Sequence, residues 1–163
     1  MIITLSMGTN LLIAFGIIMA IVLVLMILRP GQTNQKLLSI GILLVTFTVI
    51  YFILGRPANV VIDEKGIHTE SYGKIDFEWS EVESAAIVED YRNSKWNPEV
   101  KITGSGMPGF KTGRYRLDNG ETAKIITQKS NKAVVFQTDD AIYLFAFDEI
   151  EKIIETASEY VAF

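Results

Sequence analysis

The amino-acid sequence predicts a mainly β protein, an antiparallel barrel or sandwich with a C-terminal amphipathic helix, preceded by two transmembrane helices. Three observations lead to this fold class. Two long uncharged segments occupy the first third of the chain, short alternating runs follow from residue 59, and a helical stripe lies near the end. We therefore divide the 163 residues into a helical hairpin at 1–56 and a β domain at 57–163, which is long enough for one core.

Residues 11–28 and 37–54 each form an uncharged run of eighteen residues. An apolar helix needs about 20 residues to cross the hydrocarbon core, so each run predicts a transmembrane helix. We expect Pro30 and Gly31 to end the first helix, and Arg29 and Lys36 to reach the interface. A cleaved signal peptide followed by one anchor is disfavoured, because no basic residue precedes the first run and no small-residue cleavage site follows it. We expect a multi-pass protein of the cell membrane, anchored in the lipid bilayer by two helices; the charges do not identify the side that carries the β domain.

Short runs of alternating apolar and polar residues follow, separated by the turn-forming residues Gly, Asn and Asp. Runs of this length and spacing are typical of an antiparallel sandwich or barrel. The predicted strands are 59–63, 66–72, 75–79, 82–88, 100–103, 110–117, 122–127, 133–138 and 142–147.

The last predicted element is a helix whose apolar residues share one face. Asp148 is expected to cap its start, and Glu151 to complete a capping box three residues later. The apolar face consists of Ile150, Ile153, Ile154, Ala157 and Val161.

The hairpin at Asn119-Gly120 has two alternative registers. A two-residue turn would mix apolar and basic side chains on each face, whereas a three-residue loop with left-handed Gly120 separates them. We expect the three-residue loop, because one face must be buried. The apolar face then holds Tyr115, Leu117, Ala123 and Ile125, and the other face holds Arg114, Arg116 and Lys124.

Charge is unevenly distributed along the β domain. Residues 101–132 hold seven bases and two acids, whereas 63–99 and 139–163 are acidic. Two interpretations stay open: a solvated face paired with neighbouring acids, or a face that meets anionic lipid headgroups or an acidic protein partner. The formal charge of −4 disfavours nucleic acid as a partner. The candidate binding face comprises Lys111, Arg114, Arg116 and Lys124.

The segment 104–109 spells G-x-G-x-x-G, the string of a dinucleotide-binding turn. Nucleotide binding is not expected, because the string leads into an alternating strand with no crossover helix, and Phe110 interrupts the related Walker A pattern. A loop that makes a wide connection and a loop that presents a docking surface are the two interpretations left. The candidate binding loop comprises Gly104, Gly106, Met107, Pro108, Gly109 and Phe110.

The other chemistry-bearing residues predict no catalytic or metal site. His68 is the single histidine and cysteine is absent, which leaves at best one imidazole for zinc and no thiol nucleophile. The sequence has no nucleophile elbow and no pair of carboxylates that its pattern forces into one cleft. The sequence identifies no small-molecule substrate, and we expect no cofactor and no enzymatic activity.

The glycine segment with its following strand (103–117), the Asn119-Gly120 turn and the strands at 133–147 that lead into a helix resemble the bacterial pleckstrin-homology (PH-like) domain family. More narrowly, they resemble the branch with an N-terminal two-helix membrane hairpin. The resemblance covers about residues 59–160 and implies a PH-like barrel with a C-terminal helix, but no established activity or ligand.

We therefore predict a membrane-tethered, non-catalytic PH-like module for binding or scaffolding, which recognises a protein partner or an anionic membrane surface. A structural subunit of a larger membrane complex is one alternative, in which Gly16 and Gly41 would pack against foreign helices. An enzyme of unrecognised chemistry is the other.

Overall fold

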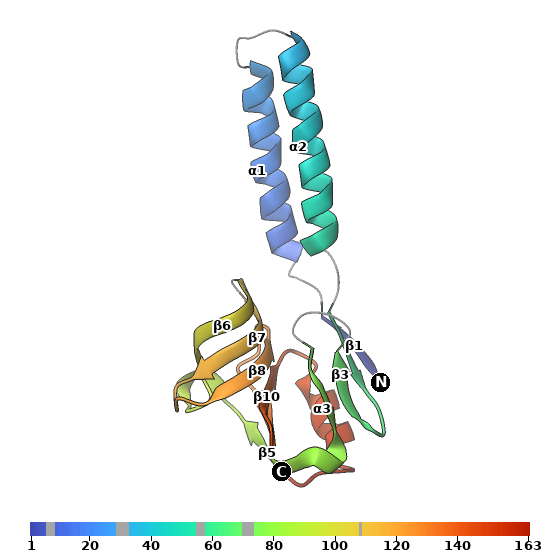
Figure 1. Ribbon diagram of the computed structural model, residues 1–163, viewed down its shortest axis with the longest axis vertical. Coiled ribbons are helices and arrows are strands. Elements are labelled where there is room, and N and C mark those ends of the chain that lie inside the picture. Colours follow the sequence, from blue (N-terminus) through green and yellow to red (C-terminus); the bar gives the residue numbers. More distant parts are fainter. Residues whose placement is uncertain (6–8, 29–32, 55–57, 70–73, 108) are drawn as a thin grey trace. The chain divides into compact units, whose positions relative to one another are not determined.

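The residues described by the computed structural model (Figure 1) are 1–5, 9–28, 33–54, 58–69, 74–107 and 109–163. The chain forms two compact units. The helical unit consists of Ser6–Pro57, and the β unit joins Met1–Leu5 to Ala58–Phe163.

The helical unit contains two antiparallel helices, α1 (Thr9–Leu28) and α2 (Thr33–Leu54), which lie side by side (Figure 1). They cover the two apolar runs of the sequence, neither of which contains a helix-breaking proline. Within the residues that the structure describes, no helix is long and apolar enough to cross a membrane. Large apolar side chains on both helices are more than half exposed, among them Ile17, Leu25, Leu38 and Val45.

The first residues of the chain form a strand of the β unit. β1 (Ile2–Leu5) pairs antiparallel with β2 (Ala58–Ile62). The strand forms because its side chains alternate: Ile3 and Leu5 are buried in the core, whereas Ile2 and Thr4 face solvent.

This strand changes the domain division that the sequence predicts at residue 56. Residues 1–5 belong to the β unit rather than to the hairpin. Leu5 lies opposite Ala58 in the ladder, so residues 6–57 are an insertion between two neighbouring strands of one sheet.

β1 and β2 belong to a four-stranded antiparallel sheet in the order β1-β2-β3-β4, with β3 at Gly66–Thr69 and β4 at Asp76–Glu78. The β2–β3 connection is tight. The Asp63 carboxylate closes it by accepting hydrogen bonds from the backbone N–H groups of Lys65 and Gly66, at 2.8 and 3.1 Å.

The second sheet consists of six strands, of which four have the predicted bounds. They are β5 (Val82–Val88), β6 (Pro98–Met107), β7 (Phe110–Leu117), β8 (Thr122–Thr127), β9 (Ala133–Thr138) and β10 (Ile142–Ala146). Their order across the sheet is β5-β9-β10-β8-β7-β6.

One ladder departs from the predicted antiparallel arrangement. β8 and β10 run parallel, with Leu144 opposite Ile125. The cause is the order of the strands: after β8 the chain forms β9 beside β5, and β10 then returns antiparallel to β9 into the place between β9 and β8. The other described ladders are antiparallel.

Both faces of the six-stranded sheet are covered by apolar side chains. Phe136 and Phe145 face the four-stranded sheet and α3 (Ile150–Ala157), the predicted C-terminal helix, whose Ile153 is fully buried. The protein is therefore a mainly β sandwich with a C-terminal helix. The cluster on the opposite face contains Tyr91, Trp96, Tyr115, Leu117, Ile125, Val135 and Leu144.

The predicted capping box of α3 is wrong. The residue at the N-cap is Glu149, and its side chain makes no capping hydrogen bond. A backbone turn replaces the cap, because the Ile150 N–H donates to the Phe147 carbonyl at 3.1 Å. The Glu151 carboxylate instead accepts a hydrogen bond from the Lys132 ammonium at 2.8 Å.

Candidate functional site

The β7–β8 hairpin has the three-residue loop that the sequence predicts. The Leu117 N–H donates to the Glu121 carbonyl at 2.8 Å, and the Gly120 N–H donates to the Leu117 carbonyl at 2.9 Å. Gly120 has a φ of 85°, the left-handed conformation that this loop requires. The predicted register is therefore confirmed, and Arg114 lies opposite Lys124.

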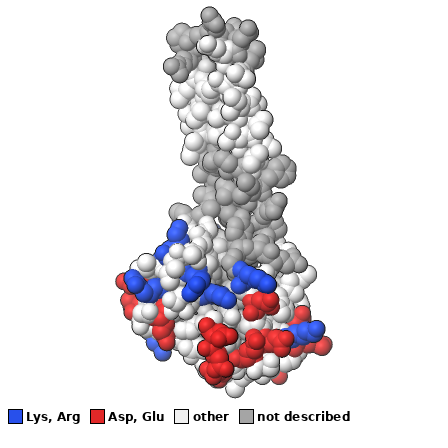
Figure 2. Space-filling model, viewed as in Figure 1, with Lys and Arg blue, Asp and Glu red and all other residues white. Residues whose placement is uncertain are grey.

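This register gives β7 and β8 one buried and one exposed face. Tyr115 and Leu117 are buried, whereas Arg114 and Arg116 are exposed and Lys124 is half-buried. We call the last three the β7–β8 basic face. None of the ion pairs described for the chain includes these three side chains. Figure 2 shows that most of the Lys and Arg side chains in view gather on one part of the β unit, apart from a group of acids.

Lys111 does not belong to this face, although the sequence analysis grouped it there. It is three residues from Arg114, and side chains on a strand alternate, so the two lie on opposite faces of β7. The Lys111 ammonium donates to the Pro98 carbonyl at 3.3 Å and lies 5.9 Å from the centroid of the Tyr115 ring.

The predicted binding loop is largely strand. Gly104 and Gly106 lie within β6, and Met107 pairs with Phe110, so that the connection between β6 and β7 is tight rather than wide. Gly109 lies in this turn with a φ of 81°. Pro108 lies outside the described residues, and Phe110 is buried rather than presented to a partner.

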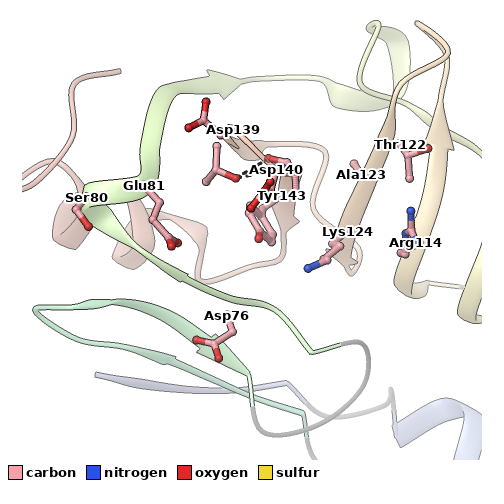
Figure 3. A pocket seen from close by; sticks show the side chains of 12 residues that line it. Asp76, Ser80, Glu81, Arg114, Thr122, Ala123, Lys124, Asp139, Asp140 and Tyr143 are labelled. Atoms are coloured by element: carbon pink, nitrogen blue, oxygen red, sulfur yellow. Dashed lines mark hydrogen bonds between the residues drawn. The ribbon is translucent and has the colours of Figure 1, made fainter.

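Two members of the basic face line a cavity of about 770 Å³ in which opposite charges are separated (Figure 3). Arg114 and Lys124 lie on one side, and the Lys124 ammonium is 5.2 Å from the centroid of the Tyr143 ring. Carboxylates occupy the rest of the wall. They belong to Asp76, Glu81, Asp139 and Asp140.

These acids are site residues that the sequence pattern does not indicate. Asp139 and Asp140 lie in the connection between β9 and β10, and their approach to β7 and β8 depends on the strand order. Asp139 also acts on Glu83: its side chain hydrogen-bonds to the Glu83 carboxyl and, with its own charge, raises the pKa of Glu83 above the ordinary value. No local signal connects these acids with Arg114, because the residues that line this cavity are distant in sequence.

His68 lies between two carboxylates on the four-stranded sheet. Its Nδ1 is 2.6 Å from Asp76 Oδ1, and its Nε2 is 3.8 Å from Asp63 Oδ1. The pKa of Asp63 lies below its ordinary value, because the Lys65 and Gly66 backbone N–H groups and then His68 favour the carboxylate. Among the described residues, no group of three or more side chains is arranged to hold a metal ion.

These features define a class: a small β-sandwich domain that is closed by a C-terminal helix and exposes a charged strand face. The family model of the bacterial PH domain matches residues 58–160, more than half of the chain. The chain belongs to this family, and its two sheets and C-terminal helix fit a PH-like sandwich. No curated protein and no solved structure matches the chain. The match begins at the first residue of β2, so that β1 is an addition to the matched region.

Proposed function

We propose that this chain is a non-catalytic binding module held at the cell membrane by its helical hairpin, and that the β7–β8 basic face binds an anionic membrane surface. PH domains are generally non-catalytic binding modules, which supports the first part. The observation that carries the second part is the common exposed face of Arg114, Arg116 and Lys124, on which no described ion pair neutralises the charge.

The energy of such a face is modest. Each base near an anionic leaflet contributes about 1 kcal/mol, so three bases contribute about 3 kcal/mol. This binding free energy is smaller than the value of about 4 kcal/mol that corresponds to a dissociation constant of 1 mM. A tether raises the effective concentration of the surface to about millimolar, so that a tethered face of this free energy is occupied for roughly one seventh of the time, whereas the same face free in dilute solution would be almost unoccupied. The tether and the basic face therefore act together.

Membrane attachment is supported by the two uncharged runs at 11–28 and 37–54 and by the apolar side chains that α1 and α2 expose. Extraction of bacterial membranes with alkaline carbonate tests the attachment. We expect the full chain to stay in the membrane pellet; its release into the supernatant would contradict the proposal.

The face is tested with the full chain in nanodiscs of phosphatidylcholine alone or mixed with phosphatidylglycerol. An amine-acylating reagent measures the accessibility of Lys124, with Lys152 on α3 as internal reference. We expect anionic lipid to slow the acylation of Lys124 at low ionic strength and high salt to abolish this protection, because screened charges at an exposed surface interact weakly.

A pair of double variants controls this experiment. Arg114→Gln with Arg116→Gln removes two charges from the face and should abolish the protection of Lys124. Lys65→Gln with Lys74→Gln removes the same charge elsewhere on the β unit and should leave the protection intact. Equal acylation of Lys124 in neutral and anionic nanodiscs would refute the membrane role of the face.

The charge-separated cavity supports a second candidate function, recognition of a protein segment that carries both charges. Its acids oppose an anionic surface, whereas they suit a basic side chain whose acidic neighbour meets Arg114 and Lys124. Under this alternative, lipid charge has no effect on Lys124. Asp140→Asn would then reduce the amount of a partner that crosslinks to the chain in intact membranes.

A further inference from the structure

We propose that the β unit contains a binding pocket for a small phosphate ester, formed by Arg92, Lys111 and Lys129. These bases line a second cavity, of about 520 Å³, a size usual for small-molecule sites. The other lining residues are neutral. They are Tyr91, Asn97, Gly109, Phe110, Thr127 and Gln128.

Three separate segments bring the bases together. Arg92 comes from the 3-10 turn Tyr91–Asn93 between β5 and β6, Lys111 from the start of β7, and Lys129 from the connection between β8 and β9. The lining of the cavity therefore has three positive charges and no carboxylate. A pocket of this kind attracts anions, because its charges are not neutralised within its own wall.

Arg92 is held in place by neutral groups. Its Nη2 donates to the Gln128 and Lys129 carbonyls at 3.4 and 3.2 Å, and its Nε donates to the Tyr91 hydroxyl at 3.4 Å. Its guanidinium carbon lies 5.7 Å from the centroid of the Tyr91 ring. These contacts fix the side chain without cancelling its charge, and among the contacts that the structure describes none uses Nη1. A planar guanidinium with free donors suits the oxygens of a phosphate.

Lys111 is positioned in the same manner. Its ammonium donates to a carbonyl oxygen, that of Pro98, and lies over the Tyr115 ring, so that it too has a neutral partner. Two cations held by neutral acceptors, with a third beside them, match a doubly charged phosphate better than a singly charged carboxylate. The pocket is larger than a phosphate alone, which leaves room for the organic part of an ester.

Three of the residues that line the cavity are fixed in the buried part of the fold. Tyr91, Phe110 and Thr127 are all buried, at 3%, 6% and 2% exposure. Tyr91 and Phe110 supply the aromatic part of the lining, and the three bases supply its charge. Lining residues that are packed in this way need little reorganisation on binding, which favours affinity.

The pocket is distinct from the β7–β8 basic face. Lys111 lies on the opposite face of β7 from Arg114 and Arg116, and neither of those arginines lines the cavity. The proposal of this pocket is therefore independent of the membrane role proposed above. The same strand also supplies a matched control, since Arg116→Gln removes one exposed base from its other face.

The test is calorimetric titration of the full chain in neutral detergent with glycerol 3-phosphate, at constant ionic strength. We expect saturable binding. Arg92→Gln and Lys111→Gln should each raise the dissociation constant about tenfold or more, the loss of one charge-assisted hydrogen bond. Arg116→Gln should change it by less than about twofold. The melting temperature of each variant without ligand shows whether it is folded.

Glycerol, which lacks the phosphate, should give no heat of binding, and a chain that binds it equally well would overturn the proposal. Absence of saturable glycerol 3-phosphate binding would also overturn it, as would an equal loss of affinity in Arg116→Gln. Vesicles that contain phosphatidic acid identify the source of the phosphate. If these vesicles compete with glycerol 3-phosphate for the wild-type chain but not for Lys111→Gln, the phosphate belongs to a lipid headgroup. If they do not compete with glycerol 3-phosphate for the wild-type chain, the ligand is a soluble ester. Both results support the pocket.

Discussion

Gly104 and Gly113 lie opposite each other on β6 and β7, and both have left-handed φ angles, of 111° and 119°. A Cβ on Gly104 would overlap the Thr112 carbonyl oxygen, and a Cβ on Gly113 would overlap the Thr103 carbonyl oxygen. The two strands therefore approach each other more closely than side chains permit, next to an irregularity of the ladder between Lys101 and Thr103.

This pair gives the first prediction. Gly113→Ala should destabilise the protein by about 3 kcal/mol or more, because an unfavourable φ, which costs about 1–2 kcal/mol, adds to a backbone clash. Gly109→Ala is the matched control: its φ is also positive, at 81°, but a Cβ there has open space. Thermal unfolding of the full chain in detergent measures both variants. Equal destabilisation by Gly113→Ala and Gly109→Ala would show that the close approach of the two strands adds nothing to the cost of the substitution.

The second prediction concerns β1. Ile3→Ala should destabilise the β unit by about 2–5 kcal/mol, as for other buried isoleucines, because Ile3 is 2% exposed. Ile2→Ala, one residue away at 66% exposure, should change stability by less than about 0.5 kcal/mol. Hydrogen exchange of the β2 amides distinguishes the two variants, and the same exchange rates in both would mean that β1 is not docked.

A third prediction follows from the pairing of Leu5 with Ala58. A variant in which Asn-Gly replaces residues 6–57 should fold in water as a β-rich monomer, since a two-residue turn suits two antiparallel neighbours. Residues 58–163 alone lack Ile3 and Leu5 and should be less stable by about 3–6 kcal/mol, the burial of two large apolar side chains. Far-UV circular dichroism and denaturant titration compare the two. Equal denaturation midpoints for the two variants would contradict a stabilising role for β1.

The fourth prediction concerns how stability depends on pH, because the pKa values of two carboxyl groups are shifted in opposite directions. The pKa of Asp63 is lowered by the backbone N–H groups of Lys65 and Gly66, so that this carboxylate stabilises the fold above its ordinary pKa of 3.8 and loses that effect as the pH falls. The melting temperature of Asp63→Asn should lie below that of the wild type at neutral pH and approach it in acid.

The pKa of Glu83 is shifted in the opposite direction, because its neighbour Asp139 raises it above 4.5. Its contribution is present below that value and is lost as the pH rises through the higher pKa of the folded state. Glu83→Gln should therefore gain stability relative to the wild type as the pH rises from about 4 to 7. Melting temperatures across this range measure both variants, and parallel curves would contradict the two shifts.

The β7–β8 hairpin could be predicted from sequence because turn chemistry and alternation agree there. Gly120 supplies the left-handed residue, and only one register separates the apolar from the basic side chains. The same alternation excludes Lys111 from the basic face, since its distance of three residues from Arg114 assigns the two side chains to opposite faces. Local pattern is sufficient wherever the neighbours that matter are close in the chain.

Other features depend on distant partners. The glycines at 104–109 look like a loop by composition, and only the pairing of Gly104 with Gly113 makes them part of a strand. β1 is four residues long and is followed by uncharged residues, so that no signal separates it from the apolar run. Arg92 and Lys129 line the second cavity together, but they come from two connections, β5–β6 and β8–β9. The order of the strands in the sheet brings these connections close to each other.

The insertion of residues 6–57 between β1 and β2 also sets an order of events during synthesis. β1 leaves the ribosome before the helices, and its partner β2 leaves after them. At bacterial speeds, translating the intervening residues takes roughly 3–10 seconds, during which the short first strand has no partner. The helices are therefore complete before the four-stranded sheet can form, and the domain is assembled only on a chain whose hairpin has already been made.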